Sequence, residues 1–227
     1  MLEPLVLAAV LATAAAPTPS PAPSSASQPL TEIGHVTSSA ICTSIVVRAN
    51  SAIGAALRND QTVSLAVDTL RHVNLDTSNV IERQKGMNAI ERLAEELRQS
   101  SGDADAQIKK LRDLAAKSDD PVRKEELKEF ADALGGALQR QRRIGADLQR
   151  MLVIMDGRQA RLEAQRDVMY SNPGVIAPGA AWNDTFSTQH FNAIALAAAQ
   201  EVENRTLSIA ADESKAADHV VGAVSGC

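Results

Sequence analysis

Two cysteines allow one covalent link in this chain. Cys42 lies near the start of the first predicted helix, and Cys227 is the last residue of the sequence. In an oxidising compartment they could form a disulfide. Closing so long a loop stabilises the folded state by about 5 kcal/mol in the chain-entropy model. Two alternatives stay open, namely a buried thiol at Cys42 and a free or intermolecular thiol at Cys227.

The four histidines are the next residues that could do chemistry, as metal ligands. His35 and His219 are expected near the same end of the protein as the cysteines, and are weak candidates for such a site. A di-iron bundle needs Glu-x-x-His on two helices, and only Glu32 to His35 fits that spacing. Capping or surface roles explain histidines of this kind better. We therefore predict no metal site and no cofactor.

No catalytic pattern is recognisable along the chain. A glycine-rich phosphate loop, a Ser/His/Asp or Cys/His order and a paired-acid motif are all missing from the sequence. The formal net charge of −5 argues against a nucleic-acid binder, which normally carries a basic face. The sequence thus predicts a protein that is not an enzyme and that acts on a protein partner or on itself.

Aromatic residues are rare, at 2% of the chain, and most of them gather around one predicted loop at 171–187. A long connection without its own helix or strand is uncommon unless it is functional or tied down. The group could form a ligand or partner surface with Trp182 as its anchor. Alternatively, it pins the loop over the open end of the core, which is the interpretation we prefer. The group comprises Tyr170, Trp182, Phe186 and Phe191.

The N-terminal segment predicts export. Residues 1–16 contain an apolar run of signal-peptide length, although Glu3 stands where a basic residue is usual. The alternative is an apolar tail of a cytosolic protein. Residues 17–30 are rich in Pro, Ser and Ala and are expected to form a disordered linker before a helical domain at 31–227. We expect a periplasmic or extracellular protein with no transmembrane helix in the mature chain.

Apolar periodicity predicts the elements that would position these residues. Alternating three- and four-residue spacing runs from Thr31 to about Asn74 and includes the polar residue Asn59. A second apolar seam runs from Val80 to Ala115 and keeps its phase through Gly102. Both segments are therefore expected to be continuous helices, with N-caps for the second among residues 75–78.

The third and fourth helices are predicted from their boundary residues. Asp120 before Pro121 is typical of a helix start, and the seam that follows reaches Tyr170. The fourth helix is expected to begin at a Ser187 cap, with Phe186 and Phe191 forming a hydrophobic staple, and to end near Val221.

Short connections between these helices predict antiparallel neighbours. The expected fold is all-α, an elongated up-down-up-down four-helix bundle with coiled-coil-like seams; less regularly packed antiparallel helical hairpins are the alternative. For such a fold we predict an exported, non-enzymatic scaffold or protein-interaction module. The alternative function is an extracytoplasmic small-molecule or metal-binding sensor bundle that uses the end near the 171–187 loop.

Overall fold

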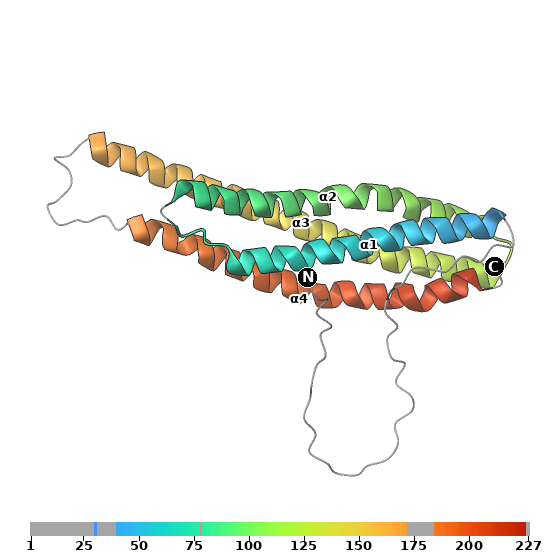
Figure 1. Cartoon of the computed structure of the whole chain (residues 1–227). Helices are drawn as coiled ribbons and strands as arrows, with labels where there is room; N and C mark the ends of the chain where they lie inside the picture. The colour runs from blue at the N-terminus through green and yellow to red at the C-terminus, as the bar shows by residue number, and fades with distance from the viewer. Residues whose placement is uncertain (1–29, 31–39, 78, 172–183, 226–227) are drawn as a thin grey trace, which may run out of the picture.

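Four long α-helices make up the described part of the chain in this computed structural model (Figure 1). They are α1 (Ala40–His72), α2 (Val80–Ala116), α3 (Pro121–Ser171) and α4 (Asp184–Val224). The structure describes residues 30, 40–77, 79–171 and 184–225, and these residues contain no strand. The predicted all-α class is confirmed.

The helices form an elongated up-down-up-down bundle. Each helix packs against its neighbours in chain order, and α1 also packs against α4, which closes the ring. The start of α1 and the end of α4 lie at one end of the bundle, here named the C-terminal pole (Figure 1). The end of α3 and the start of α4 lie at the opposite end, the loop pole. The predicted antiparallel arrangement is confirmed.

The core consists of two apolar clusters arranged along the bundle. The cluster nearer the C-terminal pole packs around Phe130 and Ile53, both fully buried. The cluster nearer the loop pole packs around Ile90 and Leu97, also fully buried. All four helices contribute to each cluster. The polar residues that separate the two clusters form the candidate site described below.

Side-chain caps fix two of the helix starts. The Asn79 side chain accepts hydrogen bonds from the backbone N–H groups of Ile81 and Glu82 at 3.0 and 3.4 Å. Asn79, one residue beyond the predicted range, is thus the N-cap of α2. The Asp120 carboxylate accepts from the N–H of Val122 at 3.0 Å, so the predicted start of α3 is confirmed.

Glycines inside the helices do not break them. α2 runs through Gly102, and α3 runs through Gly145 to Ser171. At Gly145 a Cβ would lie 2.8 Å from the carbonyl oxygen of Ala94. This glycine therefore allows α3 to approach the α2 backbone closely, which is a packing role.

The predicted start of α4 is wrong. The helix begins at Asp184, three residues before Ser187, and ends at Val224. An N-cap has non-helical backbone, so Ser187 cannot cap α4, and the staple built on that cap is lost. The segment after Asp184 contains neither glycine nor proline, and nothing in it stops the helix from starting earlier.

The connection between α1 and α2 is fastened to α4. The Asp76 carboxylate accepts hydrogen bonds from the backbone N–H groups of Phe191 and Asn192, at 3.0 and 3.2 Å. In return, the Asn192 side chain accepts one from the N–H of Leu75 at 2.7 Å. These bonds fix the height at which α4 passes the end of α1.

Two segments differ from what the sequence predicts. Leu30, assigned to the linker, is only 9% exposed and belongs to the cluster around Phe130. α1 is long and apolar enough to cross a membrane by length and composition, against the prediction that no later segment approaches such a span. A core helix passes the same test, and 44% of its most apolar window is buried in the bundle.

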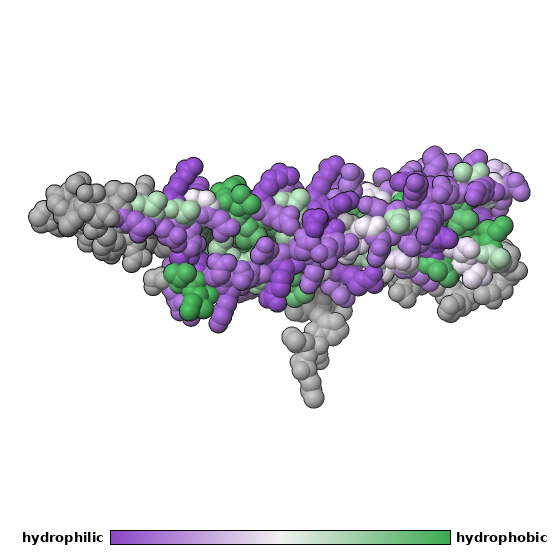
Figure 2. Space-filling view, turned by 90° about the horizontal axis from the view of Figure 1, so that it is seen from above, coloured by the Kyte–Doolittle hydropathy of each residue, from purple (hydrophilic) through white to green (hydrophobic). Residues whose placement is uncertain are grey.

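The surface seen in Figure 2 is mainly hydrophilic, with separate small apolar patches. Large apolar side chains that are 49–76% exposed occur on all four helices. The exposed large apolar side chains are therefore not gathered on a single described helix.

Candidate functional site

A layer of polar side chains crosses the bundle between the two apolar clusters. It begins at Asn59, the polar residue in the α1 seam, which is 1% exposed. The Asn59 amide donates to the side-chain oxygen of Gln141 on α3 at 3.0 Å and accepts from the hydroxyl of Ser100 on α2. Three helices are thus joined at one level.

Gln141 connects this level to the fourth helix. It is fully buried, and its Nε2 donates to Asp60 at 2.8 Å, to Glu213 of α4 at 3.3 Å and to the carbonyl oxygen of Ala56 at 3.2 Å. Since the amide nitrogen has only two protons, these bonds are partly shared. We name Asn59, Asp60, Ser100, Gln141 and Glu213 the polar layer.

The two carboxyl groups of the polar layer hold a proton between them. The pKa of Glu213 is raised to about 8. The largest cause is burial, and the next are the charge of Asp60 and the hydrogen bond between the two groups. Burial also raises the pKa of Asp60, against the lowering effect of hydrogen bonds from Glu213 and Gln141. At neutral pH Glu213 is therefore protonated and donates to the Asp60 carboxylate.

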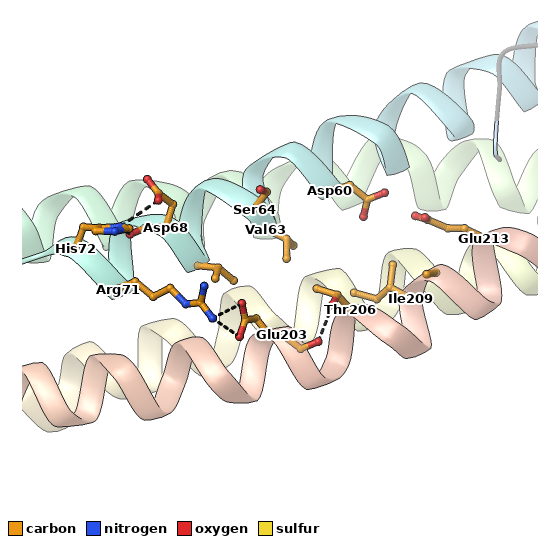
Figure 3. A pocket seen from close by; sticks show the side chains of 12 residues that line it. Asp60, Val63, Ser64, Asp68, Arg71, His72, Glu203, Thr206, Ile209 and Glu213 are labelled. Atoms are coloured by element: carbon orange, nitrogen blue, oxygen red, sulfur yellow. Dashed lines mark hydrogen bonds and ion pairs between the residues drawn. The ribbon is translucent and has the colours of Figure 1, made fainter. Parts of the chain in front are cut away.

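A groove of about 640 Å³ extends from this pair along the seam between α1 and α4 (Figure 3). Val63, Val67 and Ile209 give it an apolar middle. The groove is lined by Asp60, Val63, Ser64, Val67, Asp68, Arg71, His72, Glu203, Thr206, Ile209, Ala210 and Glu213.

Two ion pairs lie at the far end of the groove. The Arg71 guanidinium lies 2.6 Å from Glu203, joining α1 to α4, and the His72 ring lies 3.0 Å from Asp68 (Figure 3). These contacts engage the side chains of both Arg71 and His72. The negative charge of Asp60 has no such cationic partner among the described residues, so the end at the polar layer keeps the excess of negative charge.

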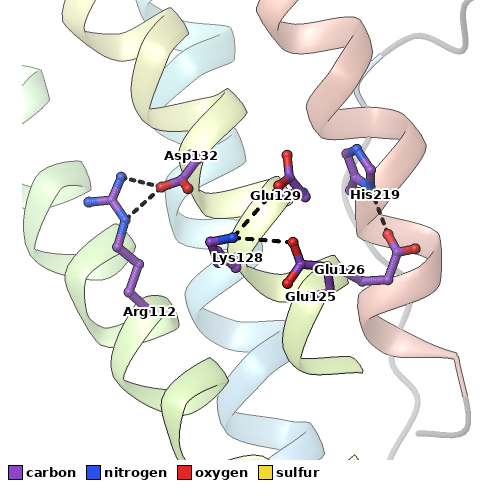
Figure 4. A network of polar contacts seen from close by, with 7 residues as sticks. All are labelled: Arg112, Glu125, Glu126, Lys128, Glu129, Asp132 and His219. Carbon is purple, nitrogen blue, oxygen red and sulfur yellow. Dashed lines mark hydrogen bonds and ion pairs between the residues drawn. The ribbon is translucent and has the colours of Figure 1, made fainter. Parts of the chain in front are cut away.

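The residues predicted as metal ligands are not brought together in the described part of the chain. His219 lies 2.7 Å from Glu126 of α3 (Figure 4), and His35 lies outside the described residues. The described residues contain no group of three or more His, Cys, Asp or Glu side chains that could hold a metal ion. A side-chain contact between α4 and α3 accounts for His219.

Of the two cysteines in the predicted disulfide, the structure describes Cys42 alone. Cys42 is 3% exposed near the start of α1, whereas Cys227 lies outside the described residues. The pairing therefore stays a prediction.

The predicted aromatic surface is also tested only in part. Phe191 is 3% exposed and packs in the cluster around Ile90, which favours a structural role. Trp182 and the side chains of Tyr170 and Phe186 lie outside the described residues.

The sequence contains a signal for the polar layer that periodicity alone did not expose. The α3 seam passes from Leu138 to Ile144, and Gln141 lies midway between them, three residues from each. Asn59 likewise occupies a seam position on α1. Polar residues at seam positions on two helices indicate a buried contact. Asp60 and Glu213 can be identified as their partners only when the relative heights of the helices are known. The sequence does not provide those heights.

No protein-family model, curated protein or solved structure matches this chain.

Proposed function

We propose that this protein is an exported, non-enzymatic binding module that takes an elongated organic cation in the groove between α1 and α4. The observation that carries the proposal is the position of the Asp60–Glu213 pair at one end of an otherwise partly apolar groove. An ammonium group has three donors and no acceptor, and it fits a site of two carboxyl groups. The apolar middle then contacts the hydrocarbon part of the same ligand.

The dimensions of the groove favour an extended molecule. Its lining runs from Asp60 to His72 on α1, which is about 18 Å at 1.5 Å per residue. A groove of this length along the α1–α4 seam suits an extended aliphatic amine.

The arrangement of the lining residues supports binding over catalysis. His72 lies at the opposite end of the groove from the Asp60–Glu213 pair (Figure 3). The hydroxyl of Thr206 donates to the backbone of its own helix, at the carbonyl oxygen of Glu203. Among the described lining residues, the carboxyl pair therefore has no imidazole at its own end of the groove.

Titration with a series of linear diamines and the matching monoamines should release or absorb heat in calorimetry at pH 7. We expect Asp60→Asn to weaken binding of the best diamine by about tenfold or more, since each tenfold corresponds to about 1.4 kcal/mol. Asp113→Asn changes the charge equally on an exposed part of α2 and should bind like the wild type. An absence of heat with every amine, or an equal loss in both variants, would contradict the proposal.

We also propose that export is accompanied by a disulfide between Cys42 and Cys227. The burial of Cys42 near the start of α1 and the end of α4 at Val224 support it, because both lie at the C-terminal pole (Figure 1). A disulfide between these ends would constrain the unfolded chain.

The intact mass of the protein secreted by its native host tests this part of the proposal. We expect cleavage after Ala14 and two thiols that react with an alkylating reagent only after reduction. A full-length mass with two freely reactive thiols would contradict both export and the disulfide. Alkylation of the unfolded protein provides the control for thiols that are merely buried.

A second candidate function is a scaffold for a protein partner or for self-association. The exposed large apolar side chains on all four helices favour it. We rank it second because single exposed apolar residues are normal on protein surfaces. A molecular mass that rises with concentration in light scattering would favour this function.

A further inference from the structure

The seam between α1 and α4 is crossed by polar contacts near the groove, as the α2–α3 and α3–α4 seams are by ion pairs. α3 is joined to α4 by Arg140–Asp212 at 2.6 Å and by Arg205–Asp147. α2 is joined to α3 by the ion pairs Arg112–Asp132 at 2.8 Å and Arg142–Asp105 at 3.1 Å. Across α1 and α4, the described residues form the exposed Arg71–Glu203 pair and the Asp60–Glu213 contact.

The Asp60–Glu213 contact also lies where apolar packing is interrupted. The cluster around Phe130 ends at Ala56 on α1 and at Ala216 on α4. The cluster around Ile90 resumes at Val63 on α1 and at Ile209 on α4. Between these limits, the two carboxyl side chains replace apolar contacts across the seam.

We propose that the Asp60–Glu213 contact is a proton-controlled latch on the α1–α4 seam. While one proton lies between the two carboxyl groups, their hydrogen bond holds α1 against α4. When the proton leaves, two like charges face one another in a half-buried position, and the helices move apart at the groove. The proposal goes beyond the binding function because it requires no ligand.

Among the described contacts of the pair, none is with a cation that could offset the second charge. On α3, Gln141 contributes a neutral amide, and Arg140 is engaged by Asp212 at 2.6 Å. Asp212, on α4 itself, adds a further negative charge that raises the pKa of Glu213. Asn59 on α1 and Ser100 on α2 are neutral and hydrogen-bonded to each other. After proton loss, the repulsion is therefore opposed by the hydrogen bonds of the Gln141 amide and not by a cation.

The clusters on either side limit the movement. Both apolar clusters include residues of α1 and α4, so the seam stays closed above and below the latch. Proton loss should thus widen the groove locally without separating the whole helices. With the pKa of Glu213 near 8, the change falls at mildly alkaline pH.

Two exposed leucines beside the groove provide positions for measuring the seam. Leu65 and Leu207 directly follow the lining residues Ser64 and Thr206, and they are 57% and 76% exposed. Nitroxide labels attached through a ketone-bearing amino acid at these two positions leave the native cysteines untouched. Pulsed electron paramagnetic resonance then gives the distance between the labels. A reference pair at Arg92 and Val153 spans the α2–α3 seam.

The latch predicts that the distance between the labels on Leu65 and Leu207 grows by roughly 2 Å or more from pH 6 to pH 10, as in other helix shifts. The reference pair should not change. Glu213→Gln, and separately Asp60→Asn, should keep the pH 6 distance at both pH values. An unchanged wild-type distance would overturn the proposal, and so would an equal increase in both variants. Far-ultraviolet circular dichroism identifies a variant that has failed to fold. The label distance in the other variant then tests the proposal.

Discussion

Gln141→Leu is expected to lower the free energy of unfolding by about 3 kcal/mol or more at pH 7. The substitution removes the one side chain that hydrogen-bonds Asn59, Asp60 and Glu213 together. Leucine fills similar space, but it leaves polar atoms on α1 and α4 without a partner in the interior. Urea unfolding followed by circular dichroism measures the change.

Gln139→Leu is the matched control for this prediction. It makes the same chemical change two residues earlier on α3, at an exposed position. A surface substitution of this kind should alter the stability by no more than about 0.5 kcal/mol. Equal losses in both variants would show that Gln141 is not a special position, and a stabilised Gln141→Leu protein would contradict the energetic role of the layer.

The polar layer also has a consequence for the register of the helices. A buried polar residue in an apolar seam is best satisfied at one relative height of its neighbours, and it penalises the others. Here Asn59, Gln141 and Glu213 come from three helices and meet at one level. Ala-rich seams such as that of α1 pack similarly at several heights, so the layer selects one of them.

The parts of the fold that the sequence predicts correctly are those governed by local patterns. The α2 seam continues through Gly102 because the apolar phase on both sides agrees, and the Asp120–Pro121 boundary starts α3 by local capping chemistry. Short connections then make successive helices antiparallel. Each of these inferences requires only residues that are close together in the chain.

The parts that the sequence does not predict depend on distant residues. The start of α4 was misplaced because Ser187 has the right type for a cap, and a residue type alone does not fix where a helix begins. Glu213 appears as an ordinary acidic residue on a helix surface until Asp60 and Gln141 are placed against it. The groove also depends on distant residues, since it is formed by two helices from opposite ends of the domain.

Stability should fall as the pH rises from about 4.5 through 8, and Glu213→Gln should remove much of that fall. The raised pKa means that the folded protein binds the Glu213 proton more tightly than the unfolded chain, whose pKa is near the model value of 4.5. The contribution of this proton is fully present below the unfolded pKa and is lost as the pH passes the folded pKa of about 8. The wild type therefore loses stability over this window, and a permanently neutral glutamine does not.

The size of this effect is limited by the partial exposure of the side chain. A shift of this size would correspond to about 5 kcal/mol if the group were fully withdrawn from water. Solvent screening reduces it to about 2 kcal/mol. Between pH 5 and pH 9, we therefore expect the free energy of unfolding of the wild type to fall by about 2 kcal/mol more than that of Glu213→Gln. Asp218→Asn on the exposed face of α4 is the control and should follow the wild-type curve. Parallel stability curves for Glu213→Gln and the wild type would mean that Glu213 titrates normally, and the carboxyl pair would then hold no proton at neutral pH.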